Sequence, residues 1–75
     1  MEEQLLNIFR GVFTEEDPAT ITLDSEFREF EQYSSLTQMT LIEEIQEKMN
    51  VKLKLLPIIK AETIGDVLEA IEAAE

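Results

Sequence analysis

The 75-residue sequence contains no cysteine and no histidine. These absences exclude disulfides, catalytic thiolates, imidazole bases and metal sites built from Cys and His. A chain without cysteine suits a reducing compartment, and the opening Met-Glu-Glu-Gln has the wrong charge for a secretory signal. The longest uninterrupted apolar stretch, residues 55–59, is far shorter than the ~20 residues needed to cross a bilayer. We therefore expect a cytoplasmic protein.

Basic residues are also scarce. Six Lys and Arg stand against seventeen Asp and Glu, so that the formal net charge is −11. Nucleic acid and anionic membrane are poor partners, because binding to either one requires an excess of Lys and Arg. A protein partner with a basic surface is favoured instead. Charge of this size on a small body also disfavours a tight homodimer, so we expect a monomer.

Only two glycines and two prolines occur, which leaves little turn chemistry for an all-β fold. Apolar residues at helical spacing predict three long helices, at roughly 2–13, at 35–49 and from Thr63 onward. Pro57 at a first helical position predicts a short helix through Lys60. The sequence therefore predicts an all-α fold, a small four-helix bundle in a single domain over residues 1–75.

Two segments between these helices need a separate explanation. Residues 14–34 form a long first loop, which we expect to be held over the bundle by its apolar residues Ile21, Leu23, Phe27, Phe30 and Tyr33. Residues 51–55 alternate like a strand. No second strand is predicted to pair with this one, so we expect an extended linker with Leu53 and Leu55 turned inward.

The start of the second helix holds the most informative residue. Ser35-Leu36-Thr37-Gln38 matches the S-x-x-Q capping box, which predicts that the Ser35 hydroxyl caps the helix. A phosphodiester on that hydroxyl would lie beside unsatisfied N–H groups and the positive end of the helix dipole. The alternative is that Ser35 is simply a capping serine.

The same helix predicts a docking surface. Two apolar residues, Leu36 and Met39, do not belong to its buried stripe, and they alternate in space with Glu43, Glu44 and Glu47. An apolar spot ringed by carboxylates suits transient docking of basic enzymes. The alternatives are packing at the edge of the core for the apolar pair and an ordinary solvated face for the glutamates.

The carboxylates do not predict catalysis or a metal site. Acid–base catalysis needs a carboxyl group desolvated in a pocket, whereas the three glutamates fall opposite the apolar stripe of their helix. The acidic segments 15–17 and 24–26 lack the ligand spacing of an EF-hand. We therefore predict no catalytic residue, no metal ligand and no enzymatic activity.

The sequence resembles the acyl carrier proteins and the related peptidyl and aryl carrier domains. The hallmark of that family is Asp-Ser-Leu at the start of the second helix of an acidic four-helix bundle, and Ser34-Ser35-Leu36 corresponds to it here. The likeness covers nearly the whole chain, through the long first loop and the apolar residues of the second and last helices. Three departures stand out: Ser34 replaces the usual aspartate, Glu31-Gln32 replaces Leu-Gly, and the short helix is flanked by lysines. The last two favour a specialised set of partners.

The resemblance implies a carrier and not an enzyme. A phosphopantetheinyl transferase would use coenzyme A to attach 4′-phosphopantetheine to Ser35, and the terminal thiol would hold an acyl or aminoacyl group as a thioester. Loading and condensing enzymes of fatty acid, polyketide or nonribosomal peptide biosynthesis would dock on Leu36 and the neighbouring glutamates. Two alternatives stay open: an unmodified carrier-like adaptor that only binds proteins, and an unrelated acidic helical scaffold.

Overall fold

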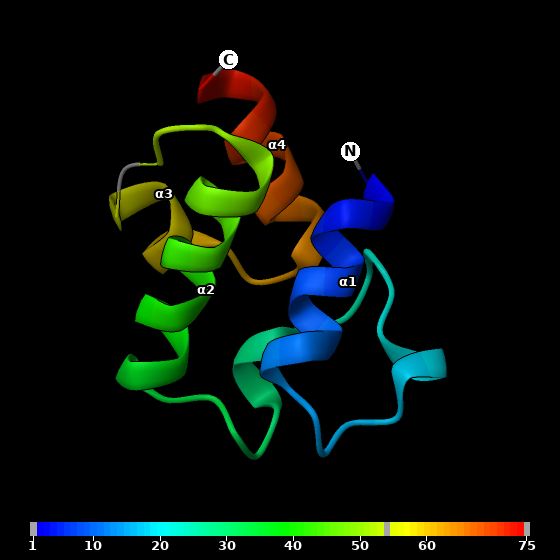
Figure 1. Cartoon of the computed structure of the whole chain (residues 1–75). Coiled ribbons are helices and arrows are strands. Elements are labelled where there is room, and N and C mark those ends of the chain that lie inside the picture. The colour runs from blue at the N-terminus through cyan, green and yellow to red at the C-terminus, as the bar shows by residue number, and fades with distance from the viewer. Residues whose placement is uncertain (1, 54, 75) are drawn as a thin grey trace.

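The computed structural model describes residues 2–53 and 55–74, which contain four α-helices and no strand. The α-helices are α1 (Glu2–Val12), α2 (Ser35–Met49), α3 (Leu55–Lys60) and α4 (Ile64–Ala74). In Figure 1, α1 and α2 lie next to each other and run in opposite directions, and α4 ends near the start of α1. The predicted fold, three long helices and one short helix in an all-α bundle, is confirmed. None of the described helices is long and apolar enough to cross a membrane.

The core forms where the apolar stripes of the helices meet. Each long helix carries apolar residues three or four positions apart, which places them on one face. The fully buried large side chains come from every part of the chain: Leu5, Phe9, Phe13, Ile21, Phe27, Leu41, Ile45, Ile58, Ile64, Val67 and Ile71. No buried side-chain nitrogen or oxygen among the described residues lacks a hydrogen-bond partner. No polar or charged residue of the described chain is buried, so the core is apolar.

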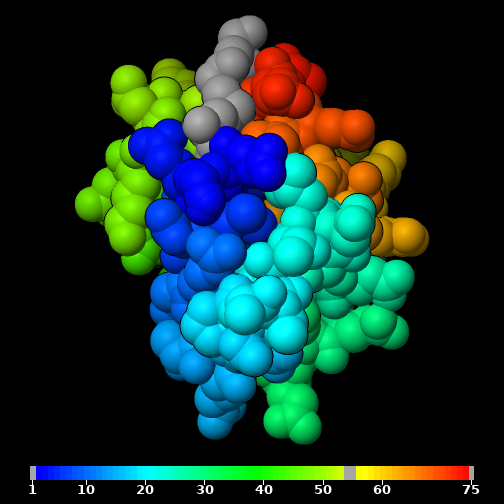
Figure 2. Space-filling model, turned by 90° about the vertical axis from the view of Figure 1, so that its right-hand side faces the viewer, coloured from blue at the N-terminus to red at the C-terminus, as the bar shows by residue number. Residues whose placement is uncertain are grey.

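The first loop contains two short 3₁₀ helices, η1 (Pro18–Thr20) and η2 (Phe27–Glu29), which the sequence did not predict. As predicted, its apolar residues hold it in place: Ile21 and Phe27 are buried, and Leu23, Phe30 and Tyr33 pack against the core. Figure 2 shows the loop spread over α1 and reaching α4. The loop is thus part of the packed structure.

Arg10 fixes the near end of the loop to α1. Its guanidinium donates to the carbonyl oxygen of Pro18 at 3.2 Å and to that of Ile21 at 3.4 Å, and it lies 3.8 Å from the Glu3 carboxylate. One of the six basic residues therefore has a structural role.

The predicted start of α4 is confirmed. The Thr63 hydroxyl accepts from the N–H of Asp66, and the Asp66 carboxylate accepts from the N–H groups of Glu62 and Thr63. These two backbone donors lower the pKa of Asp66. The loop completes this cap, because the N–H groups of Ile64 and Gly65 donate to the carbonyl oxygens of Ser25 and Leu23.

The two glycines allow a matched test of this contact. A Cβ at Gly65 would lie 3.1 Å from the Leu23 carbonyl oxygen, whereas a Cβ at Gly11 would have no neighbour within 4 Å. Gly11→Ala should therefore raise the free energy of unfolding by about 0.5–1 kcal/mol, because alanine favours a helix. Gly65→Ala should lower the free energy of unfolding. The Gly65 N–H holds the Leu23 carbonyl oxygen at 2.8 Å, so this oxygen cannot move away from a new Cβ without weakening the hydrogen bond. Urea unfolding followed by circular dichroism measures both, and stabilisation by Gly65→Ala would contradict the contact.

The short helix α3 begins at Leu55, two residues before the predicted start at Pro57. Proline is tolerated anywhere in the first turn, because the N–H groups there have no partner within the helix. Pro57 is the third residue of α3 and so did not mark its beginning. Leu53 packs against the core as predicted, and the side chain of Leu55 lies outside the described residues.

Candidate functional site

The start of α2 differs by one residue from the prediction. Ser34, and not Ser35, caps the helix: its backbone is extended, with φ −159° and ψ 175°, while Ser35 is already helical. The Ser34 N–H donates to the Thr37 hydroxyl at 2.7 Å, and the Ser34 hydroxyl accepts from the Thr37 N–H at 3.3 Å. The capping box therefore pairs Ser34 with Thr37, and the predicted box of Ser35 with Gln38 is wrong.

This shift leaves the Ser35 hydroxyl available. Ser35 is the first residue of α2 and is exposed, and its hydroxyl makes no hydrogen bond to any described residue. The capping box satisfies the N–H groups of Ser34 and Thr37, whereas those of Ser35 and Leu36 have no partner in the described chain. Two free donors and the positive end of the helix dipole thus lie beside a free hydroxyl.

A hydrogen bond and a chain of aromatic rings hold the start of α2, and with it Ser35, in place. The Tyr33 hydroxyl donates to the Gln38 side chain, which ties the residue before the cap to the first turn of α2. The Tyr33 ring meets Phe27 at 5.9 Å between centroids, and Phe27 meets Phe9 of α1 at 5.2 Å. The S-x-x-Q pattern predicted a capping role for the Gln38 amide and therefore did not indicate this hydrogen bond.

The predicted docking residues lie on the outward face of α2. Leu36 is 77% exposed and Met39 is 49% exposed, so neither packs in the core. Helical spacing places Glu43 and Glu47 on the same face, and both are exposed. Glu44 lies at the edge of this face and forms an ion pair with Lys48 at 3.3 Å.

Among the described residues, two carboxyl groups have shifted pKa values, and both lie away from the start of α2. A hydrogen bond and charge repulsion from Glu29 raise the pKa of Glu26, and backbone donors lower that of Asp66. Both groups are on the surface, and neither shift comes mainly from desolvation in a pocket. The described residues also contain no group of three acidic side chains placed to hold a metal ion.

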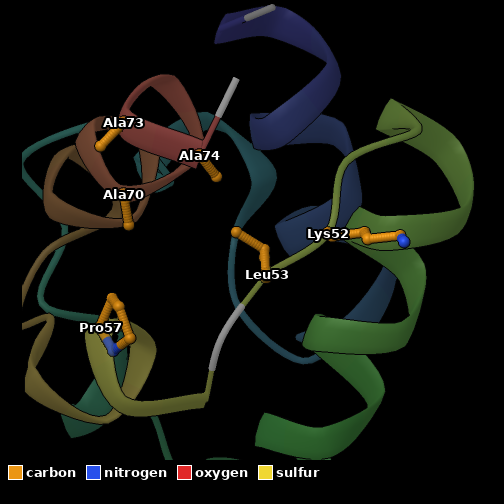
Figure 3. Close-up of a pocket in the computed structure, with 6 residues that line it drawn as sticks. All are labelled: Lys52, Leu53, Pro57, Ala70, Ala73 and Ala74. Atoms are coloured by element: carbon orange, nitrogen blue, oxygen red, sulfur yellow. The ribbon is translucent and has the colours of Figure 1, made fainter.

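A cavity of about 380 Å³ lies between residues 52–53, α3 and the end of α4. Figure 3 shows its lining: Lys52, Leu53, Pro57, Ala70, Ala73 and Ala74. The lining is mostly apolar, and the side chain of Lys52 extends away from Pro57 and from the three alanines. None of the predicted site residues lines it, since Ser35 and the docking residues belong to α2 and Lys52 follows the other end of that helix.

The start of α2 can therefore accept a covalent anionic group on an exposed hydroxyl, next to an apolar and acidic face. Comparison with known proteins agrees with this chemistry. A family model described as "Phosphopantetheine attachment site" matches residues 3–71. No curated protein and no solved structure gives a significant match.

Proposed function

Because the chain belongs to the phosphopantetheine attachment-site family of acyl and peptidyl carrier proteins, we propose that Ser35 bears its prosthetic arm. The family is defined by covalently attached 4′-phosphopantetheine, and its members are carriers without catalytic activity. The chain is accordingly a carrier protein and not an enzyme. The arm would supply a terminal thiol, on which an acyl or aminoacyl group is held as a thioester.

Attachment requires one new bond at Ser35. The hydroxyl oxygen forms an ester with the phosphorus of coenzyme A that bears the pantetheine. The pyrophosphate bond of coenzyme A breaks, adenosine 3′,5′-bisphosphate leaves, and the serine proton passes to the transferase. The resulting phosphodiester keeps one negative charge beside the free N–H groups of Ser35 and Leu36.

The single observation that carries the proposal is the unequal state of the two neighbouring serines. The Ser34 hydroxyl accepts a hydrogen bond from the Thr37 N–H and closes the cap. The Ser35 hydroxyl is exposed and without a partner among the described residues. Esterification of Ser34 would disturb the capping box, whereas esterification of Ser35 leaves it intact.

Docking of partner enzymes is proposed for the outward face of α2, defined by Leu36, Met39, Glu43, Glu44 and Glu47. Leu36 would be the apolar anchor, since it is the most exposed large apolar residue of the described chain. Glu43 and Glu47 would attract a basic rim and raise the association rate. Glu44 would contribute less, because Lys48 already neutralises part of its charge.

Family membership implies a phosphopantetheinyl transferase and biosynthetic enzymes as partners. We propose that these enzymes present basic docking surfaces and that the complexes are short-lived, because each cargo must be passed on. Fatty acyl, polyketide and aminoacyl cargoes all fit the same arm. The cytoplasmic location and the monomeric state inferred above remain predictions.

The proposal is tested by intact-mass spectrometry of the chain after incubation with coenzyme A and a broad-specificity phosphopantetheinyl transferase. The expected result is a mass gain of one phosphopantetheine, which fragmentation assigns to Ser35. A reaction without coenzyme A is the control and should leave the mass unchanged. No gain with active transferase would favour the adaptor that only binds proteins, and a gain on Ser34 would show that the attachment site is the preceding residue.

A further inference from the structure

The distribution of charge along the chain is uneven. Residues 48–61 contain four of the six basic residues and no acidic residue, although the chain carries seventeen acids. This segment includes α3 and the residues on either side of it. A positive segment therefore interrupts an otherwise strongly negative protein.

The same segment exposes apolar surface. Only four large apolar side chains of the described residues are exposed, and two of them, Leu56 at 59% and Ile59 at 40%, belong to α3. With Lys60, which is also exposed, they have i, i+3, i+4 spacing, so the three share one side of the helix. Ile58 on the opposite side is only 2% exposed and anchors α3 in the core.

We propose that this side of α3, called here the basic face and defined by Leu56, Ile59 and Lys60, docks a partner protein with an apolar cleft rimmed by carboxylates. Its apolar residues supply contact area, and its charge selects against basic partners. The outward face of α2 has a similar apolar pair with the opposite charge. The two faces would therefore bind partners of opposite charge, which goes beyond the carrier function proposed above.

Lys60 has no ion-pair partner among the described residues. The ion pairs of the described residues involve Arg10 with Glu3 and Lys48 with Glu44, and neither includes Lys60. Its charge is therefore available to a partner. At physiological ionic strength the Debye length is about 8 Å, so a partner seated on α3 senses the local positive charge more than the net charge of the chain.

The observations favour a protein over an anionic membrane. A membrane is an extended negative surface that would also face the acidic remainder of a chain with net charge −11. The basic face spans one side of a six-residue helix, which offers little area for insertion into lipid. A protein partner can confine its carboxylates to the small area that meets α3.

The test uses the ¹⁵N-labelled, unmodified full chain and an acidic amphipathic peptide made of leucine and glutamate. We expect the peptide to shift the amide signals of Leu56 and of residues 58–60, while the same peptide with lysine in place of glutamate shifts those of α2. Lys60→Glu should weaken binding of the acidic peptide by about tenfold, and Leu56→Ala should weaken it by a similar factor.

Lys52→Glu is the matched control. It changes the net charge as much as Lys60→Glu does, but the Lys52 amino group points away from Pro57 of α3 (Figure 3). Binding of the acidic peptide should therefore stay within about twofold of the original. The amide spectrum of each variant also reports whether it is folded.

Three results would overturn the proposal: no binding of the acidic peptide, equal losses in Lys52→Glu and Lys60→Glu, or binding of both peptides to α3. Phosphatidylserine vesicles that bind the chain through Lys60 would also overturn it, in favour of a lipid partner. Because the chain is unmodified throughout, these results do not depend on whether Ser35 accepts the prosthetic arm.

Discussion

Phe27→Ala should lower the free energy of unfolding by about 3–5 kcal/mol, the range found for removal of a buried phenylalanine ring. Phe27 is completely buried, and its ring contacts Phe9 at 5.2 Å and Tyr33 at 5.9 Å between centroids. At 0.05–0.15 kcal/mol per residue, a chain of 75 residues has a total stability of roughly 4–11 kcal/mol. The substitution should therefore remove a large part of the stability of this protein.

The loss should be largest at the junction that Phe27 fills. Its ring links α1 to Tyr33, and the Tyr33 hydroxyl in turn bonds Gln38 of α2. Phe30→Ala is the control, because Phe30 is only half-buried and pairs with Phe13 alone. Urea denaturation measures both variants. A loss below about 1 kcal/mol for Phe27→Ala would show that the first loop does not hold the bundle together.

The long helices could be predicted because their cores are periodic. In α2, Leu41, Ile42 and Ile45 repeat at helical spacing and are all buried, and the predicted bounds of 35–49 match the structure. In α4, Thr63 just before the helix and Asp66 in its first turn marked the beginning correctly. Such signals are local, so a single sequence contains them.

Where two adjacent residues are of the same type, the sequence could not show which of them has a given role. Ser34 and Ser35 each precede a polar residue at the spacing of a capping box, and only the extended backbone of Ser34 decides between them. Residues 55–59 are all apolar or proline, so their pattern did not show that Ile58 points inward and Ile59 outward. The single-turn helices η1 and η2 are too short to display a period.

Part of the candidate site could be predicted, because it too follows from the helical periodicity of α2. The exposure of Leu36 and Met39 follows from their position off the buried stripe of α2, and the structure agrees. The ion pair of Glu44 with Lys48 was not predicted, although its i, i+4 spacing can be read from the sequence. The link from Tyr33 to Gln38 was not visible, because it depends on how the loop enters the helix.

Ser34→Ala should lower stability and preserve modification, whereas Ser35→Ala should preserve stability and abolish modification. Ser34→Ala removes the side-chain half of the capping box and should lower the free energy of unfolding by about 1 kcal/mol. That loss corresponds to a fall of roughly 4–8 °C in Tm for a domain of this size. The mass gain with coenzyme A and transferase should persist, because the hydroxyl of Ser35 is unchanged.

Ser35→Ala should give the reverse pattern. The hydroxyl makes no hydrogen bond to the described residues, so stability should stay within about 0.5 kcal/mol of the original. The mass gain should disappear completely, because alanine has no oxygen to esterify. Thermal unfolding and intact mass, measured on the same two samples, separate the cap from the attachment site. A variant of Ser35 that is folded and still gains phosphopantetheine would contradict the assignment, and loss of the gain in Ser34→Ala alone would transfer it to the capping serine.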